Sequence, residues 1–377
     1  MVNSIKKLAI LGSTGSIGQQ TLDIVRKFPD KFEVVGIACG HNTNLFIKQV
    51  KEFSPRLVHS ATDISLPNHI QRATMEEIAA HPDADIIVVA TTGKAGLKPT
   101  ISALKAGKTV AIANKEILVM AGQLLVTLAA RHNATILPID SEHCAIWQCL
   151  RGEDAPASRI LLTASGGPFF NWPRDRLAKV TATDALKHPT WKMGNKVTID
   201  SATLFNKGLE VIEAHWLFNV PYEKIEILIH RQSIVHSMVE FPDGSVKAQL
   251  SYPDMHLPIQ YALFYPRRVS NDSISRIDYT KAHTLTFEPV VCDDYPCLKL
   301  ALEAAGKGGT FPAVLCAADE VAVDLFLKNS IRFTEIATII EKTLSIHESI
   351  INPTLDEIVL SDIWAREIAL EIARKEF

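Results

Sequence analysis

Polar side chains that could hold both a cation and an anion crowd one segment of the chain, IDSATLFNKGLEVIEAHW at residues 199–216. The segment reads as the end of a strand followed by a helix. Asn206, Lys207 and Glu210 stand at i, i+1 and i+4 of that helix, so their side chains converge on one of its sides. An acid fixed beside a neutral and a positive donor is the arrangement that a combined metal-and-phosphate site needs.

An ordinary amphipathic helix is the simplest alternative for this segment. Its apolar positions would face a core, and they are Leu204, Phe205, Leu209, Ile212 and Trp216. A solvated polar face accounts for Glu213. It does not account for the polar group at the helix start, where Asp200, Ser201 and Asn206 cluster.

A second acidic group follows a predicted strand at 135–139. In an extended chain Asp140 and Glu142 point the same way, and His143 points to the opposite side. Together with Glu210 they would supply three carboxylates and no thiolate. That ligand set suits Mg²⁺ or Mn²⁺ better than zinc, with Co²⁺ as a further candidate. The alternative is that Asp140 and Glu142 only cap the next helix.

Two loops would complete a pocket. The turn TASGGP at 163–168 consists mainly of small residues and follows a strand, and Ser165 in it can hydrogen-bond a phosphate. The loop HPTWKMG at 188–194 carries Trp191 among polar and rigid residues. A tryptophan exposed on such a loop is typical of a lid that excludes water on closure. A tryptophan packed onto a neighbouring domain explains the residue equally well.

The N-terminal region carries a nucleotide-binding pattern. GSTGSIG at 12–18 stands between a predicted strand and a predicted helix, where glycines let the backbone approach a pyrophosphate at the helix N-terminus. A simple tight turn is the alternative. An NAD-binding site would place an acid at the end of the second strand. CGHN at 39–42 offers none there, which favours NADP.

The string ANKE at 113–116 ends a further strand of this region, near the position of a nicotinamide in a doubly wound fold. Lys115 is a candidate for polarising or protonating a substrate oxygen. A helix start with a solvated lysine is the alternative.

The elements that position these motifs predict an α/β protein with three domains. Val/Ile-rich strands alternate with helices up to residue 139, which predicts a doubly wound parallel, Rossmann-like sheet in an NADP-binding domain at 1–139. Its strands are predicted at 7–11, 33–38, 85–90, 109–113 and 135–139, with helices at 17–27 and 116–131.

Beyond this sheet the pattern becomes less regular. A central α+β catalytic domain at 140–276 has predicted strands at 158–164, 196–200, 224–230, 234–241 and 245–251 and a hairpin turn at 242–244. A linker at 277–296 precedes a C-terminal helical bundle at 297–377. Its helices are predicted at 297–305, 313–327, 335–345 and 356–375. Thr354 and Glu357 form a predicted capping box for the last helix.

Composition narrows the class of protein. The formal net charge of −3 leaves no positive footprint for nucleic acid or an anionic membrane, so we expect neither as a partner. The six cysteines form no C-x-x-C pair, which indicates reduced thiols in a cytosol. Lys6 and Lys7 precede an apolar run as in a signal peptide, but Gly12 makes that run too short. We therefore expect a cytoplasmic protein.

Taken together, these strings resemble one family. GSTGSIG, ANKE, IDSEH, TASGGPF, HPTWKMG, IDSATLFNKGLEVIEA, VHSMVEFPDGS and YPDM are similar to strings of the 1-deoxy-D-xylulose 5-phosphate reductoisomerase family and follow its order up to Met255. The resemblance implies a homodimeric oxidoreductase and isomerase that depends on NADPH and a divalent metal, with the dimer interface in the domain at 140–276. Such an enzyme converts a small phosphorylated sugar, 1-deoxy-D-xylulose 5-phosphate, to 2-C-methyl-D-erythritol 4-phosphate in non-mevalonate isoprenoid biosynthesis.

The resemblance also implies roles for individual residues, all given by matching strings. Catalytic residues would be Lys115, Glu142, His188 and Glu210. Metal ligands would be Asp140, Glu142 and Glu210. Substrate contacts would come from Ser141, Glu142, Ser165, His188, Trp191, Ser201, Asn206, Lys207, Glu210 and His236. Cofactor contacts would come from Gly12, Thr14, Gly15, Ser16, Ile17, Gly40, His41, Asn42, Asn114, Glu116 and Gly194.

Two residues depart from the family pattern. His41 stands where relatives often carry a lysine or an arginine, which weakens the argument for a cofactor 2′-phosphate. Arg231 replaces a common proline, and we expect this to be a surface change.

Two other functions compete with this reading. An NADP-linked dehydrogenase of a small phosphorylated carbonyl compound, without rearrangement, would act equally well without metal. A non-catalytic dinucleotide-sensing regulator could keep the glycine loop but would have no use for the three acids.

Overall fold

A parallel sheet of seven strands organises the first of two compact units in the computed structural model, which describes residues 5–281 and 283–377. This unit comprises Met1–Ile117, Gln123–Cys144 and Asp254–Ile274. The second comprises Leu118–Gly122, Ala145–Pro253 and Ser275–Phe377. The division into three domains and a linker stays a prediction.

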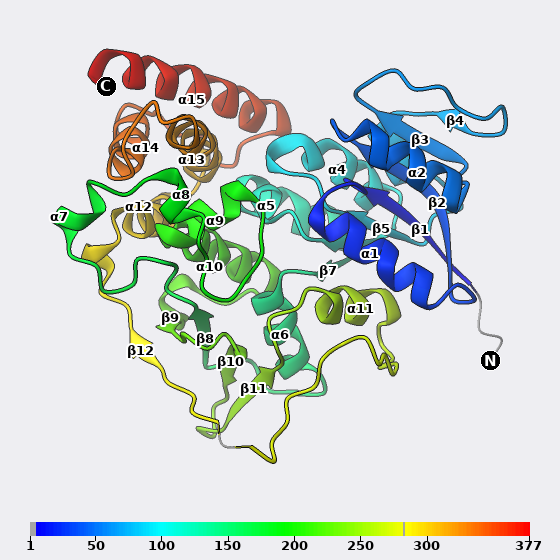
Figure 1. The fold of residues 1–377 in the computed structure, drawn as a ribbon, viewed down its shortest axis with the longest axis horizontal. Helices are drawn as coiled ribbons and strands as arrows, with labels where there is room; N and C mark the ends of the chain where they lie inside the picture. Colours follow the sequence, from blue (N-terminus) through cyan, green and yellow to red (C-terminus); the bar gives the residue numbers. More distant parts are fainter. Residues whose placement is uncertain (1–4, 282) are drawn as a thin grey trace. The chain divides into compact units, whose positions relative to one another are not determined.

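The sheet of the first unit has the order β4-β3-β2-β1-β5-β6-β7, and all neighbouring strands run parallel. Strands β1 to β5 and β7 are labelled in Figure 1. Its strands are β1 (Lys6–Leu11), β2 (Phe32–Cys39), β3 (Leu57–Ser60), β4 (Gln71–Arg72), β5 (Ile86–Val89), β6 (Thr109–Ile112) and β7 (Thr135–Pro138). The five predicted strands are confirmed. β3 and β4 were not predicted, because strands of four and two residues are too short to show a periodicity.

Helices connect these strands as in a doubly wound fold. They are α1 (Ser16–Lys27), α2 (Thr43–Phe53), α3 (Met75–Ala80), the 3₁₀ turn η1 (Gly93–Gly96), α4 (Leu97–Lys105) and α5 (Lys115–Arg131). A later helix, α11 (His256–Phe264), packs against α1, where the Phe264 ring meets Phe28 and Phe32 edge to face. The chain order reverses between β1 and β5, so the end of β1 lies where such sheets bind ligands.

A mixed sheet of five strands, in the order β11-β10-β8-β9-β12, lies in the second unit. Its strands are β8 (Arg159–Ala164), β9 (Ile225–Ile229), β10 (Val235–Glu240), β11 (Val246–Leu250) and β12 (Glu288–Pro289). The predicted hairpin is confirmed, since β10 and β11 pair antiparallel and Gly244 between them has a φ of +82°.

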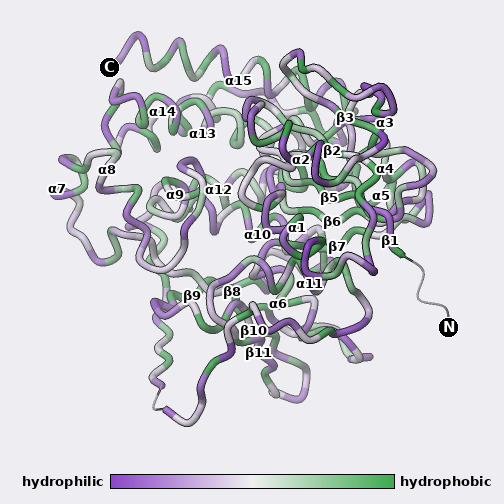
Figure 2. The backbone as a smooth tube through the Cα atoms, turned by 45° about the vertical axis from the view of Figure 1, so that its right-hand side comes forward, coloured by the Kyte–Doolittle hydropathy of each residue, from purple (hydrophilic) through white to green (hydrophobic). Residues whose placement is uncertain are grey.

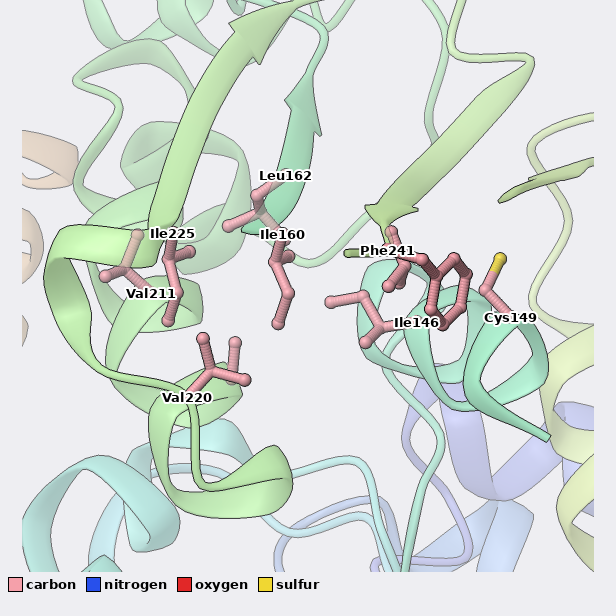
Figure 3. Close-up of a cluster of buried hydrophobic side chains, with 10 residues drawn as sticks. Ile146, Cys149, Ile160, Leu162, Val211, Val220, Ile225 and Phe241 are labelled. Carbon is pink, nitrogen blue, oxygen red and sulfur yellow. The ribbon is translucent and has the colours of Figure 1, made fainter. Parts of the chain in front are cut away.

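The core of this unit forms where the sheet meets two helices, as Figure 3 shows. Ile160 of β8 and Ile225 of β9 cluster there with Ile146 of α6 (Ser141–Leu150) and Val211 of α10 (Phe205–Phe218). The carboxyl ends of β8 and β9 lie side by side, because these two strands are parallel. The turn at 163–168 and the segment after β9 therefore start from neighbouring positions.

The predicted strand at 196–200 is wrong, because these residues lie in helix α9 (Asn195–Ala202). The β-branched run at 197–199 favours a strand locally. Contacts within the fold favour the helix instead: the Lys196 ammonium lies 2.5 Å from an Asp200 carboxylate oxygen one turn later and 2.8 Å from one of Asp319.

Leu204 joins α9 to α10 in a left-handed conformation, with a φ of +55° and a side chain that is 2% exposed. For a residue with a bulky side chain this conformation costs about 1–3 kcal/mol, and such strain concentrates at functional sites. The sharp turn brings the end of the helix that carries Ser201 directly before the helix that carries Asn206.

The C-terminal helices form the predicted bundle. They are α12 (Pro296–Lys307), α13 (Phe311–Leu327), α14 (Glu335–Ser345) and α15 (Leu355–Glu376), and α13 packs against both α14 and α15 (Figure 1). The capping box of Thr354 and Glu357 is confirmed. Hydrophilic and hydrophobic residues alternate along α15 in Figure 2, as expected for a helix with one buried side. Short turns complete this unit, at α7 (Arg174–Leu177), α8 (Ala182–Ala185), η2 (Tyr222–Lys224) and η3 (Cys292–Asp294).

Within the described ranges, none of the helices combines the length and the apolar character needed to cross a membrane.

Candidate active site

The glycine loop joins β1 to α1 through a left-handed turn at Gly12. Gly12 has a φ of +92°, and the amides of Gly12 and Ser13 both donate to the Ala38 carbonyl at 2.9 Å. Gly15 and Ser16 at the start of α1 are exposed, and no side chain caps this helix. The first amides of α1 are thus free of a side-chain cap and suited to an anion.

A buried pair of polar residues that the sequence did not reveal supports this loop. The Ser13 hydroxyl donates to Gln49 Oε1 at 2.8 Å, and Gln49 Nε2 donates to the Ser13 carbonyl at 2.9 Å. The two residues are distant in the chain, so spacing alone offered no signal for their contact.

Gly12→Ala is expected to destabilise the protein by at least about 2 kcal/mol, because the new Cβ would lie 2.4 Å from the Ala90 carbonyl oxygen at a φ that disfavours side chains. Urea denaturation measures the loss. Gly306→Ala in α12 is the matched control, since its added Cβ would meet no described atom within 4 Å beyond its chain neighbours and the backbone of its own helix. Equal stability of the two variants would contradict the tight geometry of the loop.

The segment after β2 is open to solvent. Gly40, His41 and Asn42 are all exposed at the carboxyl end of that strand. The Asn42 side chain accepts a hydrogen bond from the Leu45 amide at 3.3 Å and so caps α2. This capping role was not predicted, and the contact of these three residues with a cofactor stays a prediction.

Asn114 and Lys115 follow β6 and differ in their contacts. The buried Asn114 amide group donates to the Thr91 hydroxyl at 3.1 Å and the Gly93 carbonyl at 2.9 Å, so it holds the loop after β5 in place. The Lys115 ammonium lies 2.5 Å from an Asp140 carboxylate oxygen, and its side chain is only 11% exposed. The alternative of a solvated lysine is therefore wrong.

Asp140 and Glu142 lie together at the start of α6, with carboxylate oxygens within 4.8 Å of one another. The Ser141 hydroxyl donates to Glu142 at 2.5 Å. Two oxygens at this spacing suit a hard divalent cation. Three residues predicted as ligand or substrate contacts are thus brought together beside Lys115.

We predicted that Asp140 and Glu142 point the same way because the chain is extended there. That reason is wrong, because Glu142 lies in helix α6. His143 is also misplaced by the prediction. Its Nδ1 lies 3.9 Å from Asp140 Oδ2, since residues three apart share one side of a helix.

Asn206, Lys207 and Glu210 converge at the start of α10, as predicted. The Asn206 amide group donates to Glu210 Oε1, and the Lys207 ammonium donates to Glu210 Oε2, both at 2.5 Å. Lys207 and Glu210 are 4% and 1% exposed, so both charges are desolvated. A buried acid that holds a lysine and an amide is a preorganised site for charged ligands.

His188 links the two loops predicted to complete the pocket. Its Nε2 lies 2.9 Å from the Ser165 hydroxyl and 3.1 Å from that of Ser201. Its Nδ1 accepts hydrogen bonds from the amides of Thr190 at 3.2 Å and Trp191 at 2.9 Å. Because Nδ1 accepts, the proton of the neutral ring must sit on Nε2, where it can be donated to a hydroxyl or to a bound anion.

His188 and His236, the two histidines of the predicted site in the second unit, are held neutral. Burial, with the nearby charge of Arg231, lowers the pKa of His188 to about 4. Burial also lowers the pKa of His236 to about 4, with a smaller contribution from the Lys207 charge. His236 Nε2 contacts the Ser251 carbonyl at 3.2 Å.

Trp191 packs edge to face on the His236 ring, with centroids 5.9 Å apart, and is half-buried. The lid function of this loop stays a prediction. Gly194, at the end of the same loop, is exposed and precedes α9, with open space where a side chain would stand. The contact of Gly194 with the cofactor likewise stays a prediction.

Stability is expected to fall as the pH drops from 6.5 towards 4. The unfolded chain binds protons at His188 and His236 with ordinary pKa values near 6.5, whereas the folded chain binds them only near pH 4. The two neutral histidines therefore contribute fully to the stability of the fold above pH 6.5 and progressively less below it. The melting temperature should drop by roughly 2–5 °C between pH 7.5 and 5.

Scanning calorimetry across this range tests the expectation. His236→Asn should reduce the dependence on pH, and His69→Asn, at an exposed histidine, should leave it unchanged. A pH dependence of His236→Asn equal to that of the unmodified protein would contradict a contribution from His236.

Arg231 is not the surface residue that we predicted. It is half-buried, and its Nη1 donates to the Ser165 carbonyl at 2.5 Å and to the Gly167 carbonyl at 2.7 Å. These long-range contacts left no trace in the local sequence.

A separate cavity of about 740 Å³ lies in the second unit and is lined mainly by apolar and aromatic residues of the segments 169–177, 288–297 and 333–337. None of the residues predicted to contact substrate is among those that line it. The cavity is thus distinct from the pocket predicted around Ser165 and His188.

Comparison with known proteins gives matches over almost the whole chain. The family model described as 1-deoxy-D-xylulose 5-phosphate reductoisomerase matches residues 8–122. Models described as the C-terminal domain of the same enzyme match residues 136–218 and 250–368.

Full-length relatives agree with the family models. The 1-deoxy-D-xylulose 5-phosphate reductoisomerase of Pelotomaculum thermopropionicum is 49% identical over 99% of this chain and 100% of its own. That of Caldanaerobacter subterraneus subsp. tengcongensis is 52% identical over 96% of this chain and 98% of its own.

Solved structures are similar in fold as well. A DOX-P reductoisomerase in complex with NADPH, fosmidomycin and magnesium has a TM-score of 0.91 at 37% identity, over 98% of both chains. The reductoisomerase of Zymomonas mobilis in complex with NADPH has a TM-score of 0.90 at 39% identity, over 98% of this chain and 99% of its own.

Proposed function

Because the chain belongs to the 1-deoxy-D-xylulose 5-phosphate reductoisomerase family, we propose that it catalyses the reaction for which that family is named. It rearranges 1-deoxy-D-xylulose 5-phosphate and reduces the product with NADPH to 2-C-methyl-D-erythritol 4-phosphate, in non-mevalonate isoprenoid biosynthesis. The observation that carries this conclusion is the sequence identity to named relatives, which is 49% and 52% over at least 96% of each chain.

NADPH fits the first unit. The exposed, uncapped start of α1 can hold a pyrophosphate, and the segment after β2 has no carboxylate to repel a 2′-phosphate. Solved relatives bind NADPH. When bound, the cofactor supplies the hydride for the reduction step.

A divalent metal ion fits the acids. We assign Asp140, Glu142 and Glu210 as its ligands, because all three offer hard oxygen donors and the first two already lie within 4.8 Å of one another. A relative binds magnesium together with NADPH. When bound, Mg²⁺ or Mn²⁺ supplies electrostatic stabilisation of negative charge on substrate oxygens.

The phosphate of the substrate fits the second unit. Lys207 supplies a buried positive charge and Asn206 an amide donor, and Ser165 and Ser201 supply hydroxyl groups that both contact His188 Nε2. Since its Nδ1 accepts two amide protons, His188 presents an Nε2 proton to the anion rather than taking one from it. Binding energy from the phosphate, remote from the reacting carbons, orients the substrate.

The remaining side chains act near the reacting end. Lys115 and Ser141 stand beside Asp140 and Glu142, where an ammonium and a hydroxyl can hydrogen-bond substrate oxygens. Trp191 and its loop exclude water when the substrate is bound. His236 supports Trp191 by ring contact.

The oligomeric state and the cellular compartment complete the proposal. We expect a homodimer in the cytoplasm, an expectation that rests on the resemblance to the family and on the six free cysteines, which suit a reducing compartment. Light scattering of the purified protein tests the dimer, and a monomer mass at micromolar concentration would contradict it.

The function is tested by incubation with 1-deoxy-D-xylulose 5-phosphate, NADPH and Mg²⁺, with the product identified by NMR. A branched four-carbon chain in the product and complete loss of NADPH oxidation with a chelator are expected. An unrearranged alcohol, or oxidation that continues at the same rate without metal, would favour the simple dehydrogenase.

A further inference from the structure

We propose that Arg231 is a positioning residue for the phosphate subsite, where its guanidinium fixes the turn that presents Ser165 and adds a positive charge beside it. The inference rests on the proposed function, since it assigns this turn to the substrate phosphate. Arg231 is not among the residues predicted to contact substrate.

The position of Arg231 follows from the sheet. β8 and β9 are parallel neighbours, so the turn after β8 and the segment after β9 leave the same edge. The His230 amide donates to the Ala164 carbonyl at 2.7 Å, which fixes Arg231 directly opposite that turn. Nη1 then reaches both the Ser165 carbonyl at 2.5 Å and the Gly167 carbonyl at 2.7 Å.

The turn itself needs such a brace. Gly166 and Gly167 have φ values of +76° and +65°, and a Cβ on Gly167 would lie 2.6 Å from the Ser201 carbonyl oxygen. Glycines are required there, and a pair of glycines has more freedom to lose on ordering than any other pair. Arg231 bonds the carbonyls on both sides of Gly166, so one guanidinium nitrogen restrains the whole turn.

Ser165 is the side chain that this restraint positions. Its hydroxyl accepts a hydrogen bond from the Gly167 amide at 3.2 Å and lies 2.9 Å from His188 Nε2. The Arg231 guanidinium also stands 5.2 Å from the Phe170 ring centroid, a cation–π distance that helps to keep it against the turn.

The turn that carries Arg231 holds the second loop of the subsite as well. The Ser233 hydroxyl lies 3.0 Å from that of Thr190, two residues after His188. The residues from 230 to 233 therefore brace both segments that meet at Ser165 and His188. A charge at this place also disfavours protonation of His188, in agreement with the lowered pKa of its ring.

The test compares Arg231→Gln, Arg231→Lys and a control, Arg176→Gln. Arg176 is an exposed arginine whose guanidinium lies over the Trp172 ring, 3.5 Å from its centroid. Three quantities are measured: the Kd of inorganic phosphate for the enzyme loaded with NADPH and Mg²⁺, by calorimetry, and the kcat and KM for 1-deoxy-D-xylulose 5-phosphate, by the NADPH-oxidation assay.

Arg231→Gln is expected to raise both the phosphate Kd and the substrate KM about tenfold, with kcat changed by less than about threefold, because the bonds lost involve a charged donor remote from the reacting carbons. Arg231→Lys keeps the charge but lacks the planar guanidinium, and should raise both constants about threefold. Arg176→Gln should change neither.

A phosphate Kd of Arg231→Gln within twofold of the unmodified enzyme would overturn the proposal, and so would a loss confined to kcat. If Arg231→Gln fails to fold, Arg231→Lys decides in its place, and an unchanged phosphate Kd for it overturns the proposal. Failure of the unmodified enzyme to convert the substrate would overturn the proposed function instead, while the phosphate Kd still tests the arginine.

Discussion

Glu210→Gln is expected to lower kcat by at least about a thousandfold, which corresponds to roughly 4 kcal/mol of transition-state stabilisation. The substitution removes the one acid of α10 assigned to the metal and keeps the shape of the side chain. It also leaves the buried Lys207 ammonium facing a neutral amide where it now meets a carboxylate at 2.5 Å. NADPH affinity should stay within twofold, because the glycine loop belongs to the other unit.

Stopped-flow fluorescence measures NADPH binding, and the NADPH-oxidation assay measures turnover at saturating Mg²⁺. The matched control is Glu303→Gln, at an exposed glutamate of α12, the helix that packs on α10. Turnover of Glu210→Gln comparable to that of the control would remove α10 from the active site.

Asp140→Asn should reduce kcat/KM by at least about a hundredfold and raise the Mg²⁺ concentration required for half activity. Asp140 is the second proposed ligand, and it meets Lys115 at 2.5 Å, so its charge serves both the metal and the lysine. Removal of one carboxylate from a site of three weakens the hold on a hard cation strongly.

The double variant of Asp140→Asn and Glu210→Gln makes the sharper test, because the two residues belong to different units. Residues that act on one ion are not additive, so the double variant should be hardly slower than Glu210→Gln alone. Effects that multiply would instead assign the two acids to separate tasks and contradict the single metal site.

Features that depend on local spacing were predictable from the sequence. Asn206, Lys207 and Glu210 converge because helical geometry alone brings i and i+4 together. The glycine loop between β1 and α1 was equally accessible, since the strand, the loop and the helix are consecutive. The resemblance to the family added the residues that spacing could not rank.

Features that depend on partners distant in the chain were not predictable in the same way. The β-branched run at 197–199 indicated a strand, but the buried Asp319 of α13 pairs with Lys196 and favours the helix α9. Arg231 looked like a surface change until the parallel pairing of β8 and β9 brought it to the Ser165 carbonyl. His143 was predicted on the opposite side from Asp140 because side chains alternate sides along a strand. The residues instead form the first turn of helix α6.

The spacing along α10 has a practical consequence for inhibitor design. An anion held by Lys207 and a chelating group directed to Glu210 would both be anchored on one rigid helix. The two residues lie within one helical turn, which rises about 5.4 Å along the axis. A competitor therefore needs a spacer of matching length between its acidic head and its chelating oxygens. One methylene too few or too many would pull one end off its partner, however strongly each end binds alone.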